Sequence, residues 1–418
     1  MIVSWWQRVG IAYVILYCLP GPVEMLPGGA SIGEAFEAGE RAIVVPAGRW
    51  LFGLTLTIFP RGSGDTTYNY VELVVQLALA AIIGTAWHGV RRGRPVSPRT
   101  RDHVTMFIRF MLGGIMLSYG WAKLIPVQMP APGPERLVGT VGDMSPMALL
   151  WTFMGASLPY QMFAGFAEAL GGVLLFWRRT TLLGALILCG ALVNVVALNF
   201  CYDVPVKLYS SHLLGMAVVL VAPHLPRLAN LLVLNRPIAA VELQPFPPQR
   251  PWVRRTALAA KVVIVLFYGV GPMVTGYQVA STYGFLAPRH ALGGVYRVTA
   301  FTPTGDHGGA PLDGGPRRWV RIAVSASGTA MVLARADGSK GVTPLTIDPE
   351  RRVWTFPTSE DGAVRLEYRV ADNGVVTLDG PIGTGPVQVV LTPEGESQLL
   401  GRGFHWINEV PFNRWIRP

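Results

Sequence analysis

The segment Val104–Ile125 reads VTMFIRFMLGGIMLSYGWAKLI, an apolar stretch long enough to cross a membrane that nevertheless carries a cation near each end. Gly113, Gly120 and Lys123 follow Arg109 by 4, 11 and 14 residues, and each offset is close to a whole number of helical turns. The four residues therefore share one helical face. Because a charged side chain at bilayer depth costs several kcal/mol unless it meets water or a partner, we expect this face to point into a helix bundle.

The composition of the chain is typical of a membrane protein that carries a soluble part. Of its 418 residues, 51% are hydrophobic and 14% are charged, whereas soluble proteins average about 25% charged residues. Residues 1–285 form apolar blocks, and residues 290–418 alternate polar and apolar positions as a soluble domain does. We therefore predict a transmembrane helical domain at 1–285, a β domain at 290–400, and a tail at 401–418 that packs at the membrane interface.

Runs of about 20 apolar residues mark the expected membrane spans. Seven candidates are found: Trp5–Leu19, Tyr70–Val90, Val104–Ile125, Leu158–Trp177, Leu182–Phe200, Val206–Ala222 and Ala257–Gln278. The first could instead be a secretory signal, but Arg8 is its only basic residue and no convincing cleavage site follows, so an uncleaved span is favoured. Ala42–Pro60 is interrupted by Pro46 and Gly48, and we expect an interfacial or re-entrant segment there.

Positive charge is concentrated in alternate connections between these spans. The arginines concerned are Arg91, Arg92, Arg94, Arg99 and Arg101 in the first such connection, Arg178 and Arg179 in the second, and Arg227, Arg236, Arg250, Arg254 and Arg255 in the third. By the positive-inside rule, we expect the N-terminus in the cytoplasm and the β domain on the outer side of the inner membrane, in the periplasm or its equivalent. The same rule explains much of the formal net charge of +10, so nucleic-acid binding is not expected.

From Gly294 onward, short alternating runs predict β-strands. The runs are Val295–Phe301, Trp319–Ser325, Thr329–Ala334, Val353–Phe356, Val364–Val370, Val375–Leu378 and Val387–Leu391. Turn residues punctuate them at Ala336–Gly338, Asp372–Gly374 and Asp379–Pro381. The fold class expected is a mainly α membrane bundle followed by an all-β domain, a small antiparallel barrel or sandwich that serves for binding or docking.

A carboxylate lies near the middle of the fourth span. Glu168 shares a helical face with Gly165 and Gly172, and small residues of this kind allow a second helix to approach closely. An ionised glutamate there needs a cation, and Arg109 and Lys123 are the nearest candidates in the sequence. Two interpretations remain open: Glu168 locks two helices together, or it handles protons or contacts a substrate.

Polar residues also gather in the fifth span and around the turn into the sixth. They are Asn194, Asn199, Asp203, Lys207, Tyr209 and His212. Asn194 shares one face of the fifth span with Gly190 and Cys201, at i, i+4 and i+11 from Gly190. Such a cluster predicts a polar mouth on the outer side of the bundle. His212 either transfers protons or serves as a structural hydrogen-bonding group.

The three cysteines, Cys18, Cys189 and Cys201, are too few for a disulfide framework. Cys18 and Cys201 both fall near the outer ends of their spans, so a disulfide between them and free thiols are both open. The sequence contains no Cys-x-x-Cys motif, no pair of histidines at metal-ligand spacing and no glycine-rich phosphate-binding loop. Metal, haem and nucleotide sites are therefore not expected.

The segments Arg109–Gly114 and Tyr119–Leu124, read with Glu168 in the following glycine-rich helix, resemble the core helices of DoxX-like membrane proteins. The resemblance covers roughly residues 104–222, and the segments Asn199–Lys207 and Phe404–Glu409 resemble a long, uncharacterised branch of that family. It implies a four-helix core and a quinone-facing membrane component. Some relatives are subunits of quinone-linked oxidoreductases, including ones that oxidise thiosulfate, and others are accessory proteins of redox complexes. The family supplies no agreed set of catalytic residues.

The resemblance and the polar residues together lead to one hypothesis with two rivals. The bundle binds a quinone or a similar lipid-soluble carbonyl compound, with Glu168, Lys123 and His212 as catalytic residues. The expected cofactor-binding residues are Arg109, Asn194, Asn199, Asp203, Lys207 and Tyr209. A partner protein supplies the electrons and docks on the outer β domain. The rivals are a non-enzymatic assembly subunit and a small-anion transporter in which Arg109 and Lys123 line the path.

Overall fold

The computed structural model divides the chain into two compact units. The helical unit comprises Met1–Ile125 and Met162–Gly276, and the barrel unit comprises Pro126–Gln161 and Tyr277–Pro418. The described residues are 2–19, 29–58, 64–239, 250–282, 284–303, 318–358, 362–382 and 385–407.

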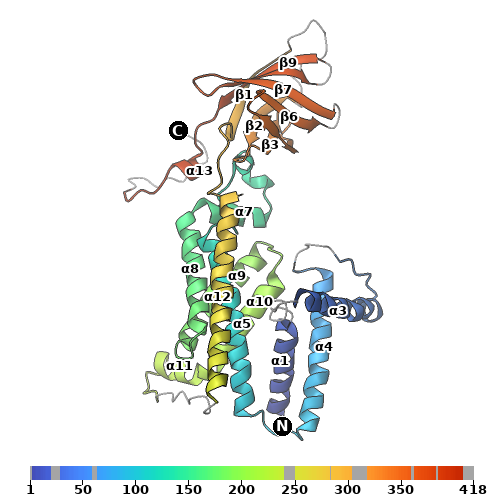
Figure 1. The fold of residues 1–418 in the computed structure, drawn as a ribbon, viewed down its shortest axis with the longest axis vertical. Coiled ribbons are helices and arrows are strands. Elements are labelled where there is room, and N and C mark those ends of the chain that lie inside the picture. The colour runs from blue at the N-terminus through green and yellow to red at the C-terminus, as the bar shows by residue number, and fades with distance from the viewer. Residues whose placement is uncertain are drawn as a thin grey trace. The chain divides into compact units, whose positions relative to one another are not determined.

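Helices make up nearly all of the described part of the helical unit (Figure 1). They are α1 (Ile2–Cys18), α3 (Gly29–Phe52), α4 (Thr67–Val90), α5 (Pro98–Leu124), α8 (Leu158–Leu175), α9 (Thr181–Cys201), α10 (Lys207–Val221), the 3-10 helix η2 (Ala222–His224), α11 (Leu225–Leu232) and α12 (Pro251–Thr282). The two long helices α8 and α12 each continue across the boundary between the units.

Five helical stretches of the described chain are long and apolar enough to cross a membrane. They are α4, α5, α9, the stretch Lys207–Leu232 and α12. The remaining two predicted spans also form helices, α1 with 17 residues and α8 with 18 residues. The structure thus confirms an apolar helical N-terminal part, whereas seven membrane crossings and their orientation stay predictions.

Local sequence signals fix where the central helices begin. The Thr66 side chain accepts a hydrogen bond from the backbone N–H of Asn69, and the Asn69 side chain accepts one from the backbone N–H of Thr66, which starts α4 with a capping box. At α5, the Ser97 hydroxyl accepts from the backbone N–H of Thr100, and Pro98 occupies the first helical position.

Glycines bring α5 and α8 into close contact. A methyl group added at Gly113 would lie 3.0 Å from the carbonyl oxygen of Gly172. One added at Gly120 would lie 2.8 Å from the carbonyl oxygen of Gly165 and 2.7 Å from the Ala169 methyl group. Side chains larger than hydrogen therefore do not fit, and the predicted glycine-lined face of α5 is the face that packs against α8.

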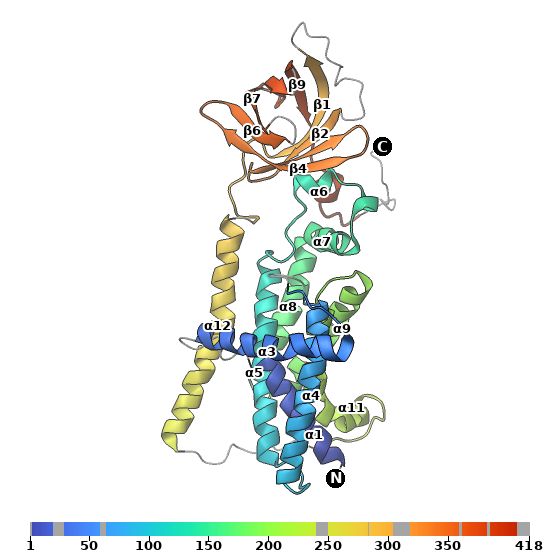
Figure 2. The same ribbon diagram turned by 90° about the vertical axis from the view of Figure 1, so that its right-hand side faces the viewer.

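The segment expected at the membrane interface is part of α3. The helix runs without interruption to Phe52, although Pro46 lies inside it, so the break expected at Pro46 and Gly48 does not occur. Figure 2 shows α3 running across α4, whereas α1, α4 and α5 run alongside one another. Trp50 is 82% exposed near the end of α3, and this arrangement is compatible with an interfacial helix.

The C-terminal domain is a nine-stranded antiparallel sheet that curls into a nearly closed barrel (Figures 1 and 2). Its strands are β1 (Gly294–Pro303), β2 (Trp319–Val324), β3 (Ala330–Arg335), β4 (Lys340–Pro344), β5 (Thr346–Asp348), β6 (Val353–Thr358), β7 (Gly362–Val370), β8 (Val376–Ile382) and β9 (Gly385–Pro393). Their order in the sheet is β4-β3-β2-β1-β9-β8-β7-β6-β5. The edge strands are β4 and β5, and β6 is the neighbour of β5. The hydroxyl of Thr343 in β4 donates to the carbonyl oxygen of Pro357 in β6 at 3.2 Å, so one edge of the sheet contacts the strand next to the other edge.

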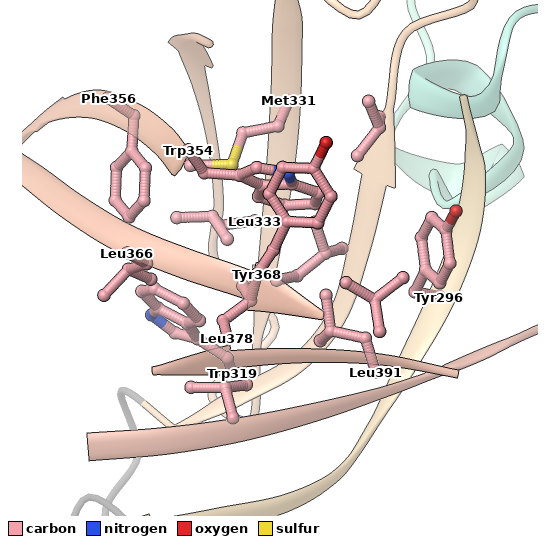
Figure 3. Packing of buried hydrophobic residues seen from close by; sticks show 14 of the residues in the cluster. Tyr296, Trp319, Met331, Leu333, Trp354, Phe356, Leu366, Tyr368, Leu378 and Leu391 are labelled. Atoms are coloured by element: carbon pink, nitrogen blue, oxygen red, sulfur yellow. The ribbon is translucent and has the colours of Figure 1, made fainter. Parts of the chain in front are cut away.

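Apolar side chains fill the barrel interior. Along β7, Val364, Leu366 and Tyr368 are buried, while the residues between them are exposed. Figure 3 shows Leu366 and Tyr368 beside Trp354 and Phe356, which β6 contributes to the same cluster. The period-two pattern in the sequence therefore predicts the inner face of these strands correctly.

The seven predicted strands all occur, but two further strands were not predicted. These are the short strands β4 and β5, which form the edges of the sheet. Gly338 and Gly374 adopt positive φ angles of 83° and 78° in turns, as their sequence context predicts. The third predicted turn is wrong, because Asp379–Pro381 lies inside β8.

The connection between α5 and α8 packs on the outside of the barrel. It contains α6 (Pro134–Leu137), the 3-10 helix η1 (Val141–Asp143) and α7 (Pro146–Ala156). Val138 is buried against Ala323 and Val332, and the Lys340 ammonium donates to the Asp143 carboxylate at 2.6 Å. The sequence did not predict this association.

The C-terminal tail begins with the short helix α13 (Gln398–Gly401). Phe404 and Trp406 are 77% and 91% exposed, so their rings are available to a membrane interface or a partner. The rest of the predicted tail, residues 408–418, lies outside the described residues.

Candidate functional site

A buried ion pair joins α5 to α8. The Lys123 ammonium donates to the Glu168 carboxylate, with Nζ and Oε2 2.7 Å apart. The two side chains are only 7% and 3% exposed. Of the two cations that the sequence offered to Glu168, the structure pairs it with Lys123.

Helix packing explains why this pair is enclosed. Gly165 lies one turn before Glu168 on α8, and a methyl group added there would lie 2.7 Å from Cβ of Lys123. The backbones of α5 and α8 therefore approach so closely that the lysine stem runs along the neighbouring helix. A short ammonium–carboxylate contact in such surroundings is a strong, charge-assisted hydrogen bond.

Two tyrosines extend the polar group around Lys123. The ammonium lies 5.7 Å from the ring centroid of Tyr119, one turn earlier on α5, and this ring lies 6.2 Å from that of Tyr209 on α10. Within the described chain, neither hydroxyl makes a hydrogen bond, and the Tyr119 side chain is 37% exposed. Tyr209 was a predicted binding residue. Tyr119 was missed, although its i, i+4 spacing from Lys123 is visible in the sequence.

Arg109 does not take part in this polar group. Its Nε and Nη2 atoms donate to the carbonyl oxygen of Leu175 at 3.0 and 2.8 Å. Leu175 is the last residue of α8, so the buried guanidinium caps the end of that helix, where the carbonyls carry partial negative charge. Because 14 residues separate Arg109 from Lys123, the two cations lie about 21 Å apart along α5.

His212 connects α10 to α1 rather than to the ion pair. Its Nδ1 atom donates a hydrogen bond to the carbonyl oxygen of Leu208 at 2.6 Å. The Nε2 atom is then the acceptor of a hydrogen bond from the Tyr13 hydroxyl. The imidazole also stacks on the ring of Tyr17, with a centroid distance of 4.1 Å. These contacts hold α10 to α1, and a role of His212 in proton transfer stays a prediction.

Hydrogen bonds within the chain hold the residues of the predicted polar mouth. The Asn199 side-chain amide donates to the Ser210 hydroxyl at 2.9 Å, which ties α9 to α10. The Lys207 ammonium donates to Asp203, and the Asp65 carboxylate accepts the backbone N–H groups at the start of α10. The Asp203 side chain is 82% exposed.

Asn194 faces away from the bundle interior. It is exposed on α9 together with Gly190 and Cys201, the residues with which the sequence aligned it. Within the described chain its amide has no hydrogen-bond partner, so the prediction that it lines an internal cofactor site is not met. All three cysteines are free, and the alternative of a disulfide between Cys18 and Cys201 is not realised.

A third buried cation, besides Lys123 and Arg109, was not recognised from the sequence. Arg8 is 1% exposed and donates to the carbonyl oxygens of Ser4 at 3.0 Å and Arg94 at 2.6 Å. Its position in the first helix was visible, but Arg94, one of its two partners, lies in the distant loop between α4 and α5. In the part of the chain that the structure describes, no group of three His, Cys, Asp or Glu side chains is arranged to hold a metal ion.

Comparison with known proteins gives one curated relative. The chain is 34% identical over 131 residues to the uncharacterized protein YwoB of Bacillus subtilis (strain 168), a match that covers 31% of this chain and 83% of YwoB. No family model matches the chain. No solved structure matches it either.

Proposed function

We propose that this chain, which belongs to the same family as the uncharacterized protein YwoB of Bacillus subtilis, is a membrane component that binds a quinone-like carbonyl compound. The observation that carries the proposal is the buried pair of Lys123 and Glu168, an acid and a base 2.7 Å apart between apolar helices. A lipid-soluble carbonyl compound needs hydrogen-bond donors for its oxygens and a route for protons. The pair supplies both kinds of group.

The surroundings of the pair support the same role. The Lys123 ammonium lies 5.7 Å from the Tyr119 ring, which lies 6.2 Å from the Tyr209 ring, and neither tyrosine hydroxyl makes a hydrogen bond within the described chain. In the proposal, these hydroxyls and the ammonium donate to the ligand oxygens, while Glu168 exchanges protons with Lys123. Reduction of a quinone to a quinol takes up two electrons and two protons, and a partner protein supplies the electrons.

The proposed placement follows the sequence. The apolar helices cross the inner membrane with the N-terminus in the cytoplasm, and the β domain docks the partner on the outer side. The resemblance to DoxX-like proteins supports a quinone-linked role. The exposed Phe404 and Trp406 add a surface that suits the membrane interface.

The test is to purify the protein in a mild detergent and identify co-purifying lipids by mass spectrometry. The proposal predicts a stoichiometric quinone in the wild-type protein and its loss in Glu168→Gln, which keeps the shape of the side chain but removes its charge. Asp203→Asn is the matched control, because this carboxylate is 82% exposed and lies outside the pair. A protein that carries no quinone in any preparation contradicts the proposal.

A second candidate function is a non-enzymatic assembly subunit. It is favoured by the observation that Arg109, Asn199, Lys207 and His212 all bond to groups of the same chain. In this role the polar residues only hold helices together, and the β domain binds a complex. The same purification tests it: a constant set of partner proteins without quinone, unchanged in Glu168→Gln, supports assembly.

A further inference from the structure

Three cations gather where α8 ends, far from the Lys123–Glu168 pair. Arg109 donates to the carbonyl oxygen of Leu175, the last residue of α8. The Lys261 ammonium, from α12, lies 4.9 Å from the ring centroid of Trp177. Arg178 follows Trp177 directly in the sequence. The three positive charges therefore surround the same short segment, Leu175–Arg178.

The register of α5 and α12 brings Arg109 and Lys261 to the same level. The two helices run in parallel, because Gly114 contacts Tyr268 and a methyl group added at Gly276 would lie 3.4 Å from the Ile125 side chain. These two contacts place Lys261 opposite residues 107–110 of α5. At about 1.5 Å per residue, Lys261 lies within about 3 Å of the level of Arg109 along the helix axes.

Two of these cations, Arg109 and Lys261, have no counter-charge within the described chain. Among the described residues, Asp102 lies 4.0 Å from Arg178, and no ion pair is formed by Arg109 or Lys261. The carbonyl end of α8 contributes roughly half an elementary charge. Arg109 and Lys261 therefore place two full positive charges beside one helix end with no carboxylate of the described chain paired to either, so an anion would be bound favourably here.

We propose that Arg109, Arg178 and Lys261 form a binding site for the phosphate group of an anionic lipid. The Arg178 side chain is 39% exposed, and Lys261 is half-buried, so both can reach a ligand at the bundle surface. Trp177 is 50% exposed, as aromatic residues at a membrane interface commonly are.

The neighbours of Lys261 favour a lipid over a free phosphate ion. Leu258 and Val262 beside it on α12 are 62% and 48% exposed, and Leu266 one turn further on is 53% exposed. An acyl chain attached to the phosphate can cover these apolar side chains, whereas an inorganic ion cannot. Basic sites between membrane helices bind lipid headgroups in this manner.

The experiment measures the binding of phosphatidylglycerol to the full-length protein in detergent by native mass spectrometry and by the shift in unfolding temperature. Phosphatidylcholine and inorganic phosphate are the comparison ligands. Lys261→Gln should weaken phosphatidylglycerol binding about fivefold, since a basic side chain near a membrane surface contributes about 1 kcal/mol. Arg255→Gln, an exposed basic residue on the same helix, is the matched control and should have no effect.

Each outcome bears directly on the proposed site. Selective binding of phosphatidylglycerol that Lys261→Gln weakens supports it. If inorganic phosphate gives the same shift, the anion site stands and the lipid tail plays no part. Equal binding of the two lipids, or equal weakening by Arg255→Gln and Lys261→Gln, overturns the proposal. This result is independent of the quinone test, because Lys261 on α12 lies level with Arg109, about 21 Å along α5 from Lys123.

Discussion

Removing one charge of the Lys123–Glu168 pair should destabilise the helical unit more than removing both. At a separation of 2.7 Å and an effective dielectric constant of about 20, the two charges attract each other by about 6 kcal/mol. Desolvation of two ions that are 7% and 3% exposed offsets most of this attraction, since it costs several kcal/mol per ion. A single variant loses the attraction and keeps one buried charge.

We therefore expect Lys123→Met and Glu168→Leu each to lower the free energy of unfolding by about 3–5 kcal/mol. The double variant replaces the pair by apolar side chains and should lose less than either single variant. The coupling energy of this double-mutant cycle is then at least about 3 kcal/mol. The assay is equilibrium unfolding in detergent micelles, followed by circular dichroism.

An exposed ion pair provides the control for this cycle. Asp203→Asn removes the partner of Lys207 in a pair whose carboxylate is 82% exposed, and we expect a loss of no more than about 1 kcal/mol. The reasoning is refuted if the losses of the two single variants simply add in the double variant. It is also refuted if Glu168→Leu unfolds as readily as Asp203→Asn.

Three further predictions concern packing, exposure and pH. Gly120→Ala should lower the free energy of unfolding by about 1–3 kcal/mol, because the new methyl group would lie 2.8 Å from the Gly165 carbonyl oxygen. Gly190→Ala is the control in the same unfolding assay, since its methyl group would meet no atom within 4 Å. Asn194→Leu should leave the helical unit as stable or more stable in detergent, because the amide is exposed and unbonded within the described chain; a large loss would show that the amide has a partner. A hydrogen bond from Gln388 holds the pKa of Asp379 below its usual value, so this carboxylate stabilises the barrel above about pH 4 and ceases to do so as the pH falls through its folded-state pKa. Asp379→Asn should therefore speed hydrogen exchange in β8 at pH 7, and the difference from wild type should disappear under acidic conditions.

Periodicity predicted the glycine-lined face of α5, but it could not choose the partner of Glu168. Arg109 and Lys123 share that face, and both are candidates on charge alone. The choice depends on the register between α5 and α8, which the contact between Gly120 and Gly165 sets. The backbone carbonyl that holds Arg109 has no sequence signature, because every residue provides one.

The direction of a helical face is the second property that the sequence left open. The alignment of Gly190, Asn194 and Cys201 on one face of α9 is correct, yet that face points outward. A spacing of 3.6 residues shows that residues share a face and not what covers it. The strands β4 and β5 were missed for a different reason, since five and three residues are too few for a clear alternation.

The central claim is that a quinone-like compound binds beside Lys123 and Glu168. The most direct test is a titration of the purified wild-type protein and of the folded Lys123→Met/Glu168→Leu double variant with menadione, a small naphthoquinone, by quenching of tryptophan fluorescence. The account predicts saturable binding to the wild-type protein and at least about a tenfold loss of affinity, or about 1.4 kcal/mol, in the double variant. Equal binding by the two proteins would contradict it.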